Sequence, residues 1–142
     1  MRAGLRAIAV VVVGGAVAVM SGCGPRLVPV TGRVTLAGKP VNRGHIWFVP
    51  DMEKGAQHSN YTPCALDADG RYALKTEELP GILPGPYKVV IFATKTVPPE
   101  NPTGWIPDWL VPARYADQST SKLAVEIVDS AVPLVHDFEL KP

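Results

Sequence analysis

Apolar and polar side chains alternate along seven short segments of this chain. In residues 45–50, Ile46 and Phe48 fall on one face and Trp47 falls on the other, together with its polar neighbour His45. A repeat of two residues is the period of a β-strand with one buried face. The same alternation predicts strands over residues 31–36, 61–66, 71–75, 87–94, 122–128 and 134–140. No segment after residue 27 shows a helical period, so the pattern predicts an all-β fold.

The phase of each alternation predicts which side chains form the core. Three of the segments point a regular set of large apolar residues to one side. The expected inward residues are Tyr87, Val89 and Ile91, then Leu123, Val125 and Ile127, and finally Phe138 and Leu140.

Glycine and proline separate the predicted strands. The chain has 13 Gly and 15 Pro, a content that disfavours helices and favours turns. Turns are expected at 37–40 and 83–86, and the Asp/Gly cluster at 67–70 is typical of a hairpin between its flanking strands. In residues 96–112, five of seventeen residues are proline. That composition predicts an ordered loop that crosses the surface rather than a central strand.

Length and charge narrow the class of protein. A chain of 142 residues fits one domain, and seven short strands are the number found in immunoglobulin-like or transthyretin-like β-sandwiches. The net charge of +1 provides no basic excess for binding phosphates, so a nucleic-acid partner is not expected.

The N-terminus has the features of an export signal. Arg2 and Arg6 precede an uncharged run from residue 7 to residue 20, which is shorter than the roughly 20 residues a spanning helix needs. The run ends in Met20-Ser21-Gly22-Cys23, which resembles a bacterial lipoprotein lipobox. The resemblance implies a signal peptide at 1–22 and lipid, including palmitate-type acyl chains, on Cys23. Ordinary cleavage that leaves a free thiol is the alternative.

Lipidation would fix the location of the protein and the state of its cysteines. A multiply acylated Cys23 anchors a domain to a membrane without spanning it, here in the cell envelope. Gly24, in place of an inner-membrane retention aspartate, favours an outer-membrane destination facing the periplasm or the cell surface. Cys64 is then left without a partner, so a buried, inert thiol and no disulfide are expected. The expected divisions are a linker at 23–29 and one domain at 30–142.

Several short motifs carry a family resemblance that runs through the mature chain in order. They are Val30-Thr31-Gly32-Arg33-Val34-Thr35, Gly38-Lys39-Pro40-Val41, Gly44-His45-Ile46-Trp47-Phe48-Val49-Pro50, Asp69-Gly70-Arg71-Tyr72, Gly85-Pro86-Tyr87-Lys88-Val89, Val111-Pro112-Ala113-Arg114-Tyr115, Thr120-Ser121-Lys122-Leu123 and Asp137-Phe138-Glu139-Leu140. These resemble the planctomycete-type lipoproteins with a transthyretin-like, carboxypeptidase-regulatory-like domain. The resemblance implies a seven-stranded β-sandwich but no particular activity.

Catalysis and metal binding are both disfavoured by the residues present. The transthyretin-like hydrolases end in a Tyr-Arg-Gly-Ser motif that is missing from the C-terminus of this chain, and the three histidines, His45, His58 and His136, fall on separate segments. Asp67-x-Asp69-Gly70 begins like a calcium loop, but Arg71 and Tyr72 occupy positions five and six of such a loop. We expect no enzyme activity, no cofactor and no metal.

The aromatic residues are the candidates for binding. Trp105 and Trp109 lie in the proline-rich segment with Tyr115 just beyond it, and Trp47 faces away from the predicted core. Such side chains serve protein hot spots and sugar stacking alike, and capping one end of the sandwich is the structural alternative. The sequence therefore predicts a non-catalytic, lipid-anchored envelope module that is structural or binds a protein. A carbohydrate-binding module is the alternative, and an enzyme of unrecognised type, built on His58 or His136, is a further one. The sequence leaves the oligomeric state open.

Overall fold

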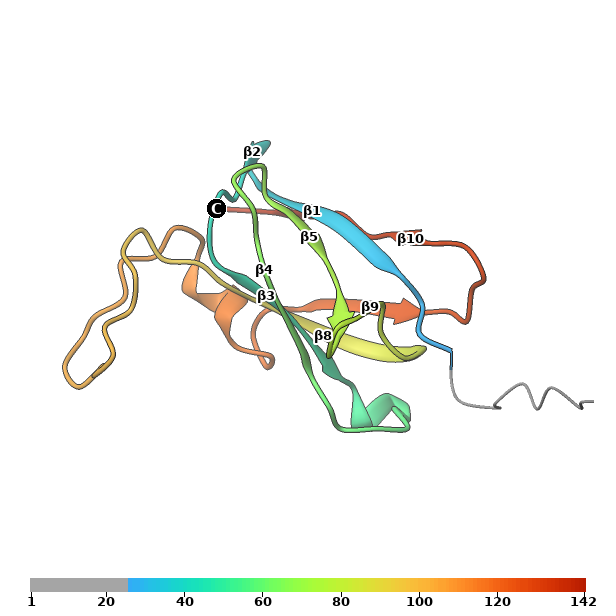
Figure 1. Cartoon of the computed structure of the whole chain (residues 1–142). Helices are drawn as coiled ribbons and strands as arrows, with labels where there is room; N and C mark the ends of the chain where they lie inside the picture. Colours follow the sequence, from blue (N-terminus) through green and yellow to red (C-terminus); the bar gives the residue numbers. More distant parts are fainter. Residues whose placement is uncertain (1–25) are drawn as a thin grey trace, which may run out of the picture.

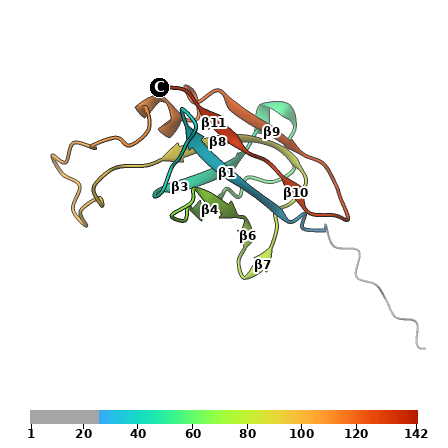
Figure 2. The same cartoon turned by 90° about the horizontal axis from the view of Figure 1, so that it is seen from above.

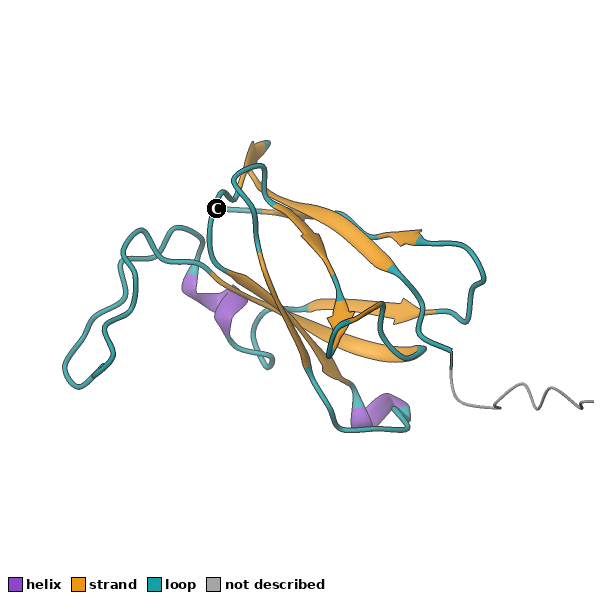
Figure 3. Cartoon of the chain, in the orientation of Figure 1, coloured by secondary structure: helices purple, strands orange, loops and turns teal. Residues whose placement is uncertain are grey.

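The structure is a computed structural model that describes residues 26–142. These residues form two β-sheets packed face to face, with short 3-10 helices as their only helical turns (Figures 1 and 3). The all-β sandwich predicted from the alternation is therefore confirmed. Within residues 26–142, no helix is long and apolar enough to cross a membrane.

The first sheet is built around β1 (Val30–Leu36). This strand pairs in parallel with β10 (Leu134–Val135) and β11 (Phe138–Leu140), and antiparallel with β2 (Lys39–Pro40) and β5 (Arg71–Ala73). The predicted strand at 134–140 is interrupted at His136–Asp137. There Tyr72 Oη donates to the His136 carbonyl, and the Arg33 N–H donates to Asp137 Oδ1 at 2.9 Å. The His136 N–H still donates to the Thr31 carbonyl, and the two side chains supply the other contacts where the strand breaks.

The second sheet is antiparallel in the order β4, β3, β8, β9. Its strands are β4 (Thr62–Ala65), β3 (His45–Pro50), β8 (Gly85–Phe92) and β9 (Leu123–Ile127). A separate two-stranded ribbon, β6 (Lys75–Thr76) with β7 (Leu79–Pro80), and the helices η1 (Met52–Lys54) and η2 (Ala113–Ala116) complete the fold.

The turn at 67–70 does not make the expected hairpin. β4 pairs with β3 and β5 pairs with β1, so this turn carries the chain from one sheet to the other. The local chemistry was right: Asp67 Oδ1 accepts the backbone N–H groups of Asp69 and Arg71 at 2.8 Å. The prediction was wrong about the pairing. β5 pairs with β1 instead of β4, and the local pattern could not show this because β1 lies far away in the sequence.

The core lies between the sheets and is rich in aromatic rings. Phe48 is fully buried and contacts the rings of Tyr72, Tyr87 and Phe138, at centroid distances of 5.9, 6.0 and 6.2 Å. The expected inward residues of β8 are all buried, as are Ile127, Phe138 and Leu140, while Leu123 and Val125 are partly buried against the core. The alternation therefore predicted this core correctly.

Two buried tyrosines make the fold sensitive to alkali. Burial raises the pKa of Tyr87 to about 12. It also raises the pKa of Tyr72, with a further increase from the Asp137 charge. Because an unfolded tyrosine ionises near pH 10, the native state holds these protons more tightly. The contribution of Tyr87 is complete below pH 10 and is lost as the pH rises through about 12, and that of Tyr72 is lost at still higher pH.

We therefore expect the free energy of unfolding to fall between pH 10 and pH 11.5, with on the order of 1 kcal/mol of the fall due to Tyr87. Urea titrations at pH 9, 10.5 and 11.5 would measure it. Tyr87→Phe should flatten the decline, while Tyr61→Phe, which changes an exposed ring, should leave the decline unchanged. A wild-type stability that is constant across this range would contradict the prediction.

Candidate functional site

The proline-rich loop projects from one end of the sandwich instead of lying across its surface. Figures 1 and 2 show it extending from the end of β8, and the described chain begins at the opposite end of the molecule. Its base is held by an isolated bridge between Thr94 and Trp109, and the Lys95 N–H donates to the Asp108 carbonyl at 2.8 Å. The side chains of Lys95 and Asp108 also form an ion pair at 3.3 Å. Residues 96–107 thus extend from a pinned stem.

The tryptophans of this loop have different surroundings. Trp109 is half-buried and packs edge-on against Phe92, with ring centroids 5.2 Å apart, so it caps this end of the sandwich. Trp105 is also half-buried and follows a turn in which its N–H donates to the Pro102 carbonyl. The most exposed large apolar side chains of the loop are Val97 and Ile106, at 80% and 85%. The alternation and composition gave no signal for these two.

Tyr115 is buried and faces the C-terminal residues. Its hydroxyl oxygen accepts the Lys141 N–H at 2.9 Å, and the Arg114 guanidinium lies 4.7 Å from its ring centroid. Burial raises the pKa of Tyr115, but the hydrogen bonds with Lys141 and Arg114 outweigh it, and the net pKa lies below the ordinary value. This buried side chain fastens η2 to the end of β11 and is therefore not part of an exposed binding surface.

Trp47 lies on the outer face of the second sheet, as its phase predicted. It is 38% exposed and stacks on Tyr61, which is 57% exposed, with ring centroids 5.4 Å apart and planes within 3°. A shallow hollow of about 380 Å³ adjoins the pair and is bounded on one side by residues 116–118. This aromatic pair is the second candidate binding surface.

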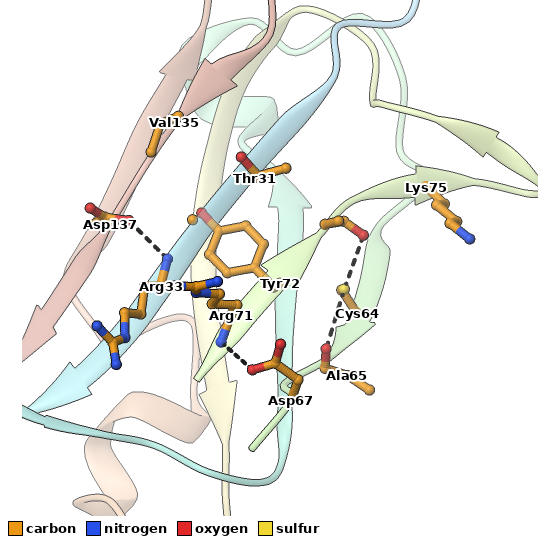
Figure 4. Close-up of a pocket in the computed structure, with 12 residues that line it drawn as sticks. Thr31, Arg33, Cys64, Ala65, Asp67, Arg71, Tyr72, Lys75, Val135 and Asp137 are labelled. Carbon is orange, nitrogen blue, oxygen red and sulfur yellow. Dashed lines mark hydrogen bonds between the residues drawn. The ribbon is translucent and has the colours of Figure 1, made fainter. Parts of the chain in front are cut away.

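A larger hollow lies over the outer face of the first sheet and was not predicted. It has a volume of about 820 Å³ and is lined by residues of β1, β4, β5 and β10 (Figure 4). Its charged lining comprises Arg33, Arg71 and Lys75 against Asp67 and Asp137. We call this hollow the arginine groove. No motif marked it, because its residues meet only through the pairing of β5 with β1.

Two arginines stand side by side in this groove. Arg33 and Arg71 are directly opposite each other in the antiparallel pair of β1 with β5. The flanking hydrogen bonds run from the Val34 N–H to the Gly70 carbonyl and from the Leu74 N–H to the Val30 carbonyl. The alternation of the ladder makes the arginine pair a non-hydrogen-bonded one, the closer kind, with Cα atoms about 4.5 Å apart.

Cys64 forms part of the wall of the groove beside the free edge of β5. Its thiol donates to the Ala73 carbonyl at 3.2 Å, and Asp67 engages both backbone groups of Arg71. Burial raises the pKa of the Cys64 thiol, which is half-buried rather than fully buried as predicted. These contacts occupy polar groups that would otherwise pair with another strand.

The histidines do not come together. His58 Nε2 lies 2.9 Å from Tyr87 Oη, and because that hydroxyl donates to the Leu83 carbonyl, the imidazole is the donor to it. The backbone of His136 bridges the break between β10 and β11, and His45 lies on the exposed face of β3. In the part of the chain that the structure describes, no three His, Cys, Asp or Glu side chains gather closely enough to hold a metal ion.

No protein family, curated protein or solved structure matches this chain in the comparisons made with known proteins. The predicted signal peptide at 1–22 and the predicted lipidation site Cys23 lie outside the described residues. Any function must therefore be inferred from the geometry described above.

Proposed function

We propose that this chain is a non-catalytic, lipid-anchored module of the cell envelope that binds another envelope protein through the loop at 96–107. The observation that carries the proposal is the projection of Val97 and Ile106 into solvent on a loop whose stem is pinned by Lys95 and Asp108. Val97 and Ile106 each lie two residues beyond the stem, and an exposed apolar patch on a projecting loop is characteristic of a contact with a partner.

The pinned stem favours binding for an entropic reason. A flexible loop loses conformational freedom when a partner orders it, and that loss weakens the complex. Here the Lys95–Asp108 contacts, the packing of Trp109 on Phe92 and the four prolines of residues 96–107 restrict the loop before it binds. More of the contact energy of Ile106 and Val97 is then available for affinity.

The predicted anchor is consistent with this role. Cys23 precedes the first described residue by three positions, a span of about 10 Å when extended. A lipid at that position would hold the N-terminal end of the sandwich close to the bilayer. The loop at the other end (Figure 1) would then point away from the membrane, toward partners.

We also propose, from the sequence motifs, that the chain belongs to a transthyretin-like, carboxypeptidase-regulatory-like family. The two-layer sandwich supports this proposal.

Photo-crosslinking would test the binding role. With a photoreactive amino acid at Ile106 of the full chain, expressed in its native cells, we expect a discrete crosslinked protein. The same probe at Val132, which is 64% exposed in the segment between β9 and β10, is the matched control, because Figure 1 shows that segment at the end of the sandwich away from the loop. Trp105→Ala should reduce the Ile106 product severalfold if the tryptophan supports the loop. Equal, diffuse labelling from both positions would contradict the proposal, and the mass of the Cys23 peptide tests the anchor separately.

The stacked pair Trp47 and Tyr61 favours a second candidate, a carbohydrate-binding module. Sugar rings stack on exposed aromatic faces, and this pair is more open than either loop tryptophan. A change in tryptophan fluorescence on adding envelope saccharides, abolished by Trp47→Ala, would favour this function over protein binding. Catalysis is not proposed, because neither His58 nor His136 donates to a carboxylate.

A further inference from the structure

The facing arginines of the groove are an unfavourable arrangement unless an anion joins them. Like charges directly opposite each other across an antiparallel pair destabilise a sheet. Arg33 and Arg71 hold such positions, and both are exposed. The ion pairs among residues 26–142 are Lys88 with Glu53 and Lys95 with Asp108, so neither arginine is neutralised by one.

The two acids of the groove are engaged with backbone groups rather than with the arginine side chains. Asp67 accepts the N–H of Arg71, and Asp137 accepts the N–H of Arg33. The Nε of Arg33 donates to the Asp69 carbonyl at 2.9 Å, which fixes that guanidinium at the rim and leaves its terminal N–H groups to a ligand. Figure 4 shows Arg33 and Arg71 on adjacent strands of the same face, with Asp137 and Asp67 beyond them on opposite sides.

The remaining lining indicates what kind of anion fits. Ala73 and the exposed side chain of Val135 add apolar surface, and the volume of about 820 Å³ exceeds what a single inorganic ion needs. Guanidinium groups match the planar geometry of carboxylates and bind them through paired hydrogen bonds. We propose that the arginine groove binds an organic carboxylate, with its acidic group between Arg33 and Arg71 and its hydrocarbon part on Val135 and Ala73.

Thermal unfolding of the full chain in a nonionic detergent, with citrate as the probe, tests this proposal. Citrate should raise the wild-type Tm saturably above the effect of sodium chloride at equal ionic strength. Arg71→Gln should shift the citrate midpoint at least tenfold higher. Without citrate, the same variant should have a Tm about 1–4 °C above wild type at low salt, because it removes the repulsion. This gain should shrink in 1 M salt.

Lys39→Gln is the matched control, since it removes one exposed positive charge from the same sheet at β2, outside the groove lining. It should keep the wild-type response to citrate. The proposal is overturned if citrate stabilises wild type and Arg71→Gln equally, or if it stabilises neither. Equal stabilisation of wild type by inorganic phosphate would overturn the assignment to a carboxylate.

Discussion

Replacing Gly32 by alanine is expected to reduce the free energy of unfolding by about 3–5 kcal/mol, more than most single substitutions do. A Cβ atom at this position would lie 2.6 Å from Tyr72 Oη and 2.7 Å from the carbonyl carbon of His136. Neither neighbour can retreat easily. The His136 N–H donates to the Thr31 carbonyl, and the His136 carbonyl accepts the Tyr72 hydroxyl. The methyl group would therefore push His136 away from β1 and disrupt the hydrogen bonds that bridge the break between β10 and β11.

The Tm of Gly32→Ala should fall by about 10–20 °C in a thermal scan. Gly38→Ala is the control that separates this steric clash from the cost of placing alanine at a position with a positive φ. Gly38 has a φ of +80°, but a methyl group there would meet no heavy atom within 4 Å, so only a conformational penalty of about 1 kcal/mol is expected. A Gly32→Ala protein that melts within a few degrees of wild type would mean that β1 and His136 do not approach as closely as the structure has them.

The sequence was a good guide to which residues form strands and which way they face. In β3, alternation alone placed Ile46 and Phe48 inside and Trp47 outside, and burial agrees. The reason is that a period of two is a local property, which one buried face imposes on each strand separately. The two-residue strands of the β6–β7 ribbon escaped prediction because they are too short to show a period.

Long-range pairing was not predictable from the same pattern. The residues 67–70 have hairpin chemistry, yet their flanking strands lie in different sheets. Arg33 and Arg71 are far apart in the sequence, and only the register of β1 with β5 makes them neighbours. Nothing local distinguishes either arginine from an ordinary solvated side chain. The arginine groove therefore results from the pairing of β1 with β5, which the sequence pattern does not reveal.

The candidate aromatic residues show the same difference between positions set by local alternation and positions set by long-range contacts. The phase of β3 predicted the exposure of Trp47, because that side chain belongs to a regular strand. Tyr115 lies in a short 3-10 turn with no period, and its place in the core depends on contacts with residues far away in the sequence, among them the Lys141 N–H. The exposure of Ile106 likewise depends on how residues 96–107 leave their stem.

Phe48→Ala is the other substitution with a large expected effect, a loss of about 3–5 kcal/mol in the free energy of unfolding. Phe48 extends from the second sheet and contacts Tyr72 and Phe138 of the first, as well as Tyr87 beside it. Its removal leaves a cavity between the layers and three rings without a shared neighbour. The two sheets themselves pack about 10 Å apart, so the remaining rings cannot fill the gap without moving the backbone.

Urea unfolding of Phe48→Ala, Phe48→Leu and Trp47→Ala would measure this effect. Leucine retains most of the volume, so Phe48→Leu should lose about 1–1.5 kcal/mol. Trp47→Ala removes a larger side chain from the same strand, but from its exposed face, and should lose less than about 1 kcal/mol. The difference between Phe48→Ala and Trp47→Ala depends on the direction of each side chain and not on its size. Equal losses for Phe48→Ala and Trp47→Ala would mean that β3 does not separate core from solvent as its alternation requires.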